Sequence, residues 1–139
     1  MTFLTLIISA TLITSGYASQ YAPNVMQRVI NTRQRGITAH TLPSTLPLVD
    51  GYVASQHCSE IGSIVHLRPS GNSEWERFLV VDCASRTSGS PNGNESSYAW
   101  MDRNNILYEI DYRTALRWHT VGRLVSIEQA SHDPERNYR

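Results

Sequence analysis

Residues 63–83 read SIVHLRPSGNSEWERFLVVDC and contain the pattern that decides the fold. Residues 63–68 alternate in part between polar and apolar side chains and include β-branched residues, which favour a strand. The cluster Pro69-Ser70-Gly71-Asn72-Ser73 is typical of a turn. Residues 75–82 become apolar towards their end, as in a second strand. Together these segments predict a β-hairpin centred near Gly71.

The two cysteines lie at the open end of this predicted hairpin. Cys58 precedes the first strand and Cys83 follows the second. Because antiparallel pairing brings these ends together, we expect a Cys58–Cys83 disulfide that closes a loop of about 25 residues and stabilises the fold by about 3 kcal/mol. Neither cysteine belongs to a Cys-x-x-Cys motif, so redox and metal chemistry are not indicated.

The N-terminal segment has the character of a secretory signal. Residues 1–27 carry no charged side chain, and Phe3 to Ile13 are apolar apart from Thr and Ser. This run is too short to span a bilayer, which needs about 20 residues, but it suits the core of a signal. Gly16 and Ala18 have the spacing for cleavage after Ala18. No Lys or Arg precedes the run, so an uncleaved anchor or a misassigned start are the alternatives.

We therefore expect a secreted protein, extracellular or periplasmic, without a stable membrane span, in a compartment where cysteines pair. The length of 139 residues suits one domain. The expected organisation is a signal at 1–18, a linker or short helix at 19–32, one folded domain at 33–128 and a disordered tail at 129–139. The net charge is zero and no basic run stands out, so nucleic acid is not an expected partner. The five histidines are scattered, and neither a metal nor another cofactor is implied.

Further strands are predicted at 51–54, 105–110 and 123–128. Asp111 follows one of them and is a good N-cap for a short helix over the next residues. The polar segment 85–97 is expected to be a long flexible loop, and Asn94-Glu95-Ser96 within it is a glycosylation sequon. Several short strands with one helix favour a small barrel over a layered α/β fold.

Ile61-Gly62-Ser63-Ile64-Val65-His66-Leu67, the glycine turn and Phe78-Leu79-Val80-Val81-Asp82-Cys83 resemble the double-psi β-barrel family of rare-lipoprotein-A-like, expansin and barwin-like proteins. In that family a return strand ends in Val-x-Asp, often with a Cys close after it. Residues 110–115 are similar to the family's Asp-Leu-Ser segment, residues 122–128 to its closing strand, and residues 36–39 to a Gly-x-x-Thr-Ala motif that is one residue longer. The resemblance implies a mainly β fold: a six-stranded double-psi β-barrel with one short helix after Asp111.

The chain also departs from the family pattern. The Trp-Tyr-Gly opening is absent, the expansin His-Phe-Asp appears as Glu109-Ile110-Asp111, and the several disulfides of expansins are reduced to one possible bridge. The resemblance still implies an open groove that binds polysaccharide, and it places the family aspartates at Asp82 and Asp111. Both follow apolar strands, where a carboxylate can gain a raised pKa and serve glycan cleavage. The alternatives are a helix cap for Asp111 and a loop hydrogen bond for Asp82.

Aromatic side chains are the expected sugar platforms, because a flat ring stacks on the apolar face of a pyranose. Tyr98 and Trp100, after the long loop, are the first candidates, and Tyr52 and Tyr112 are weaker ones. His57 lies near the histidine of the family, although Gln56 competes for that position and an ordinary surface histidine is the alternative.

Three functions follow from these residues. The first is a monomeric, non-catalytic or weakly catalytic binder of cell-wall polysaccharide such as peptidoglycan, chitin or cellulose. The second is a peptidoglycan or glycan lyase of the lytic-transglycosylase kind that uses Asp82 and Asp111. The third is a barwin-like secreted interaction protein without glycan chemistry.

Overall fold

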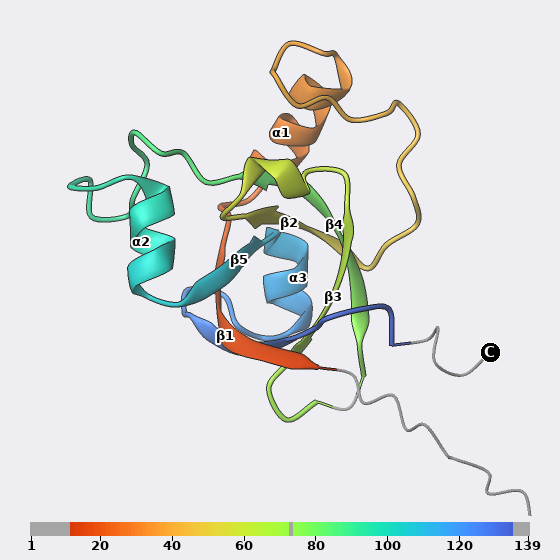
Figure 1. The fold of residues 1–139 in the computed structure, drawn as a ribbon, viewed down its shortest axis with the longest axis vertical. Coiled ribbons are helices and arrows are strands. Elements are labelled where there is room, and N and C mark those ends of the chain that lie inside the picture. Colours follow the sequence, from red (N-terminus) through yellow and green to blue (C-terminus); the bar gives the residue numbers. More distant parts are fainter. Residues whose placement is uncertain (1–11, 73, 135–139) are drawn as a thin grey trace, which may run out of the picture.

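Six strands form a closed ring of hydrogen-bonded neighbours in the order β1-β5-β2-β4-β3-β6 (Figure 1). The computed structural model describes residues 12–72 and 74–134. The strands are β1 Ile13–Gln20, β2 Gly51–Ser55, β3 Ile64–Pro69, β4 Glu76–Cys83, β5 Ile106–Ile110 and β6 Val125–Ala130. The expectation of a mainly β fold is confirmed, and its double-psi topology stays a prediction.

Helices accompany the ring at three places, and the one beside the long polar loop was not expected. The described residues contain α1 Val25–Gln34, α2 Ser97–Arg103 and α3 Tyr112–Arg117, with a short 3₁₀ turn, η1 Cys58–Glu60. The predicted helix after Asp111 is α3. None of these helices has the length and apolar character needed to cross a bilayer. In Figure 1, α1 stands above the ring and α2 lies beside it.

The core lies inside the ring and draws side chains from every strand and from α3. Its buried members are Ala18, Val53, Leu67, Phe78, Val80, Tyr108, Ile110, Ala115 and Ile127. Trp118 is partly buried and packs against this cluster, with its ring centre 5.8 Å from that of Phe78 in an edge-to-face contact. Burial of these apolar surfaces is the main force that holds the ring closed.

The hairpin that decided the prediction is present. β3 and β4 pair antiparallel, with Ile64 opposite Leu79 and Leu67 opposite Glu76. Gly71 in the connecting turn has a φ of 84°, a left-handed conformation that glycine adopts without steric cost. The local sequence signals were therefore sufficient to predict this pairing.

The sixth strand, β1, lies partly inside the segment predicted as a signal. β1 comes from the end of the predicted signal and pairs parallel with β5 and antiparallel with β6. Ala18, the predicted cleavage residue, is 1% exposed in the core. The small residues that suit a cleavage site also suit a crowded strand: a Cβ on Gly16 would lie 2.8 Å from the backbone oxygen of Asn105. Residues 1–11 of the predicted signal lie outside the described residues.

The other boundaries shift for related reasons. Strand pairing begins at β1, ahead of Arg33, and the segment expected as a linker or short helix holds α1 except for its last two residues. Met26 and Ile30 of α1 are buried in a second apolar cluster, outside the ring, with Leu79 and Val81 of β4. β6 continues to Ala130, so the first two residues of the expected tail are ordered by strand pairing. Residues 135–139 lie outside the described residues.

The expected flexible loop at 85–97 ends in a helix. Ser96 caps α2, and its hydroxyl oxygen accepts from the backbone N–H of Ala99 at 3.1 Å. The loop is tied across its base, where the backbone N–H of Ser85 donates to the hydroxyl of Ser97 at 2.8 Å. The matched segment 36–39, similar to Gly-x-x-Thr-Ala, forms bends after α1 and contributes no strand.

Candidate functional site

Asp111 caps α3 and joins it to β2. One carboxylate oxygen accepts from the backbone N–H of Thr114 at 2.7 Å. The other accepts from the backbone N–H of Tyr52 at 2.6 Å and from the hydroxyl of Thr114 at 3.1 Å. The residue is 7% exposed. These contacts are those of the helix-cap alternative, and they occupy both oxygens with structural partners.

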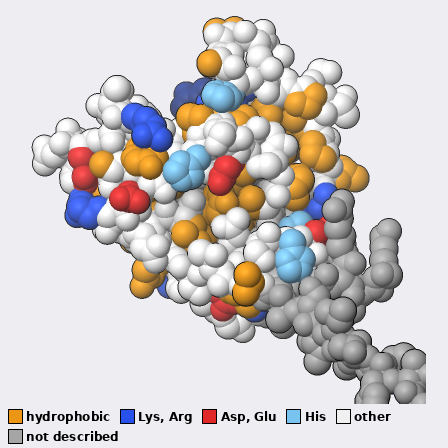
Figure 2. Space-filling view, viewed as in Figure 1, with side chains coloured by type: hydrophobic (Ala, Val, Ile, Leu, Met, Phe, Trp, Pro, Cys, Tyr) orange, Lys and Arg blue, Asp and Glu red, His pale blue; other side chains and the backbone are white. Residues whose placement is uncertain are grey.

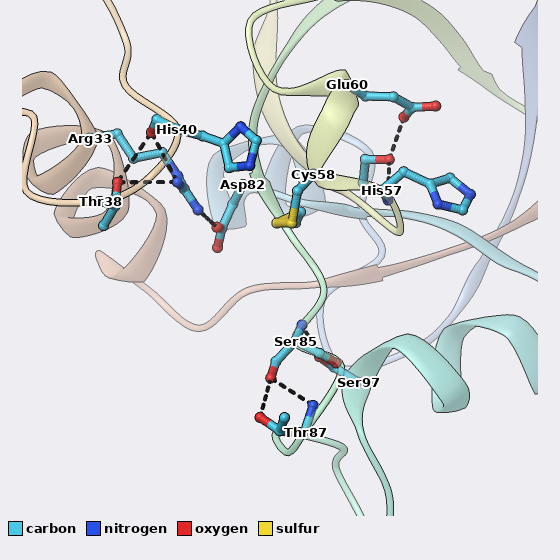
Figure 3. Close-up of a disulfide and its surroundings, with 12 residues drawn as sticks. Arg33, Thr38, His40, His57, Cys58, Glu60, Asp82, Ser85, Thr87 and Ser97 are labelled. Carbon is cyan, nitrogen blue, oxygen red and sulfur yellow. Dashed lines mark hydrogen bonds and ion pairs between the residues drawn. A yellow bond between two sulfur atoms is a disulfide. The ribbon is translucent and has the colours of Figure 1, made fainter.

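Asp82 fastens α1 to the end of β4. Its Oδ1 lies 2.5 Å from the guanidinium of Arg33, and its Oδ2 accepts from the hydroxyl of Tyr21 at 2.6 Å. Arg33 also donates to the hydroxyl of Thr38 and to the backbone oxygen of His40, as Figure 3 shows. Asp82 therefore orders a helix and the loop that follows it, which is the alternative role foreseen for this residue.

The two predicted catalytic aspartates lie on opposite sides of β2. Asp82 belongs to β4 and is level with Ala54, whereas Asp111 follows β5 and bonds to Tyr52. They line two different hollows. Asp82 borders one of about 280 Å³ beside α1, and Asp111 borders one of about 570 Å³ at the start of β2. The structure thus does not bring them together over one groove.

Glu109 is the carboxylate that the sequence did not single out. Strand register places Ser19, Glu109, Ala54 and Asp82 in one row across β1, β5, β2 and β4. The hydroxyl of Ser19 donates to Glu109 at 3.1 Å. Burial raises the pKa of Glu109 to about 7, and the charge of Asp82 adds to this rise while the Ser19 bond opposes it. In the sequence Glu109 is only one polar residue in an alternating strand, and long-range pairing creates its environment.

The larger hollow collects three of the predicted site residues: Tyr52, Asp111 and Tyr112. One wall is the N-terminal part of α1 and the residues before it. The opposite wall is the start of β2 and the first turn of α3. Asn24, Gln27, Asp50 and Arg113 add polar groups to the lining. The hollow thus combines two aromatic rings with hydrogen-bonding side chains.

The remaining predicted residues lie elsewhere, near α2. The rings of His57 and Tyr98 meet edge to face at 5.8 Å, and the guanidinium of Arg86 lies 4.1 Å from the Tyr98 ring centre. Trp100 is half-buried against the small apolar cluster around Met101. Figure 2 shows charged side chains of both signs scattered over the visible face, with no basic patch on it.

The predicted disulfide is present. Cys58 of η1 is bonded to Cys83 at the end of β4 (Figure 3). The bridge closes a separation of 25 residues, and it adjoins Asp82, the anchor of α1. It ties η1 to the end of the hairpin as the sequence predicted. Across the described ranges, no three His, Cys, Asp or Glu side chains gather in a group that could hold a metal ion.

Removal of this bridge is expected to cost about 3 kcal/mol of unfolding free energy, because the unfolded chain regains the freedom of the closed loop. Urea denaturation of the Cys58→Ser, Cys83→Ser double variant against the oxidised wild type measures the loss. As a control, a reducing agent should lower the stability of the wild type and leave the double variant unchanged. An equally stable double variant would contradict a structural role for the bridge.

Comparison with models of known protein families finds no match, and comparison with curated proteins finds no relative.

Proposed function

We propose that this chain is a secreted double-psi β-barrel protein that binds cell-wall polysaccharide in the hollow between Tyr52 and Tyr112, without cleaving it. The closed ring with its two parallel pairs, β1 with β5 and β2 with β4, supports the barrel assignment. The disulfide is compatible with an oxidising compartment outside the cytosol. Both remain inferences from the fold and the resemblance.

The hollow carries the proposal, because its lining matches what a sugar polymer needs. Tyr52 and Tyr112 come from different elements and are held close together by Asp111, whose backbone N–H donates to the backbone oxygen of Tyr52 at 3.0 Å. Aromatic rings stack on the apolar faces of sugar rings, and neighbouring polar groups bind the hydroxyls. Its volume of about 570 Å³ is within the range of small-ligand sites.

The contacts of Asp111 favour binding over cleavage. A general acid must reach the glycosidic oxygen with its proton. Asp111 has both oxygens committed to backbone and hydroxyl donors, and Asp82 borders a different hollow. Asp111, which lines this hollow together with Asp50, is therefore better suited to holding the tyrosines in place than to proton transfer.

Retention on insoluble polysaccharide tests this function. The wild type should be retained on at least one of chitin, cellulose and peptidoglycan. The Tyr112→Ala variant should lose about tenfold in affinity, which corresponds to about 1.4 kcal/mol for one stacking ring. Tyr98→Ala is the matched control, since Tyr98 lies on α2 outside the hollow, and it should bind as the wild type does.

Two results would contradict the proposal. Absence of wild-type retention on all three polymers would reject polysaccharide binding. If Tyr98→Ala loses retention and Tyr112→Ala is retained as the wild type is, the binding surface lies on α2 and not at the hollow. Thermal unfolding of each variant confirms that a loss of binding is not a loss of fold.

A further inference from the structure

α1 forms one wall of the hollow between Tyr52 and Tyr112. Polar side chains from α1 and from the segment before it contact one carboxylate, that of Asp82. Met26, Gln27 and Ile30 of this helix line the hollow. Towards the C-terminal end of the helix, Arg33 pairs with Asp82, and ahead of the helix Tyr21 donates its hydroxyl to the same group. Asp82 is thus the polar contact on β4 that, with the apolar packing of Met26 and Ile30, holds the helix of this wall.

Glu109 is the neighbour that can change this charge. It lies in the same cross-strand row as Asp82, with only the small side chain of Ala54 between them on β2. Two strand spacings separate the two positions, about 10 Å. The described groups that contact this pair are Ser19 from β1, Tyr21 from the segment after β1 and Arg33 from α1. Arg33 is the one cation among them. His40, from the loop after α1, contacts Arg33 in turn through its backbone oxygen.

We propose that Asp82 and Glu109 form a proton-controlled latch for α1: with a proton on Glu109 the helix is held against the ring, and loss of that proton loosens it. A neutral Glu109 leaves one carboxylate, Asp82, matched to one guanidinium. An ionised Glu109 adds a second negative charge near Asp82, whose one ion-pair partner among the described residues is Arg33. This second charge repels that of Asp82. Undocking of α1 and Tyr21 would let water reach the ionised Glu109 carboxylate and solvate its charge.

The pH range follows from the titration of Glu109. Its pKa is about 7 with the helix in place, against an ordinary value of 4.5, so the docked state binds a proton that the undocked state releases. The stabilisation of docking is complete below about 4.5 and is lost as the pH rises through 7. The ratio of docked to undocked helix should fall by at most about 30-fold between pH 5.5 and pH 8, the value reached when undocking restores the ordinary pKa of Glu109, and change little above that.

The consequence for ligand retention rests on the proposed function, because the hollow must bind a polymer for its wall to regulate one. If it does, retention is weaker at pH 8 than at pH 5.5. The latch itself does not need the ligand and is measurable on the free protein.

Hydrogen exchange of the α1 amides tests the latch directly. In the wild type, the protection factors of the α1 amides, corrected for the intrinsic exchange rate, should fall between pH 5.5 and pH 8. A separate titration of the Glu109 carboxyl should have its midpoint in the same pH range. Glu109→Gln, which stays neutral, should keep the helix protected throughout. Glu74→Gln removes an exposed carboxylate elsewhere and should behave as the wild type.

The outcomes separate the two proposals. Constant protection of α1 in the wild type, or an unchanged pH response in Glu109→Gln, overturns the latch, whether or not the protein is retained on a polymer. A pH-dependent α1 in a protein that no polymer retains supports the latch and rejects the binding function. If Glu109→Gln does not fold, two midpoints are compared in the wild type: the pH at which Glu109 titrates and the pH at which α1 loses protection. A clear difference between these two pH values overturns the latch.

Discussion

A chain that lacks residues 1–18 is expected not to fold, whereas a chain that lacks residues 1–11 is expected to keep the ring. The first deletion removes Ile13 to Ala18, six of the eight residues of β1. β1 lies between β5 and β6, so its loss leaves two unpaired strand edges and opens the core at Ala18. Circular dichroism and a thermal unfolding transition on the two purified chains measure the difference.

The shorter deletion is the matched control, because it shortens the same end and leaves β1 complete. A cooperative transition of wild-type midpoint in the chain that begins after Ala18 would show that β1 is dispensable and restore the predicted boundary. If the expected result holds, any leader removed on export must be cut before Ile13. Mass spectrometry of the exported chain then gives the position of the cut.

The features that the sequence predicted correctly are those set by neighbouring residues. The β3–β4 hairpin follows from two apolar runs around a glycine turn, and the disulfide follows from the hairpin, because Cys58 and Cys83 flank it. The cap of α3 follows from an aspartate placed after a strand, and the oxygens of Asp111 accept from Thr114 as capping requires. Short-range geometry was sufficient in each case.

The features that were missed depend on contacts between distant segments. An apolar segment with small residues fits both a signal and a crowded strand, and only its pairing with β5 and β6 decides for β1. Tyr21 and Asp82 are 61 residues apart, and Arg33 and Asp82 are 49 apart. No local pattern relates these residues, so the anchor of α1 could not be predicted.

The same limit explains why the ranking of the aromatic residues from the sequence differs from their distribution around the hollow. Tyr98 and Trp100 stood out because they follow a long polar loop, yet the structure places them on α2 with Arg86 and the Met101 cluster. Tyr52 and Tyr112 ranked lower, and the hydrogen bonds of Asp111 bring them to one surface. Proximity in space is the basis of the proposed site, and it arises here from the contacts of a helix cap.

Replacement of Asp111 by Asn is expected to cost about 4 kcal/mol of unfolding free energy. The carboxylate accepts from two backbone N–H groups and a hydroxyl while nearly buried. In the variant an NH₂ group would face one of these donors, so charge-assisted hydrogen bonds are lost and a buried N–H is left unsatisfied. Urea denaturation measures the loss. Asp102→Asn is the control, since Asp102 accepts from Gln56 at 3.2 Å on the surface of α2, and it should lose less than about 1 kcal/mol.

This prediction also determines how a binding or cleavage assay of the Asp111 variant is read. A variant that is several kcal/mol less stable loses the alignment of Tyr52 with Tyr112. Its loss of retention would then result from the lost helix cap and not from a lost contact between the carboxylate and the polymer. The opposite pattern is equally clear. If Asp111→Asn keeps its stability within about 1 kcal/mol and still loses retention, the carboxylate contacts the polymer directly and its capping bonds are not what holds α3 to β2.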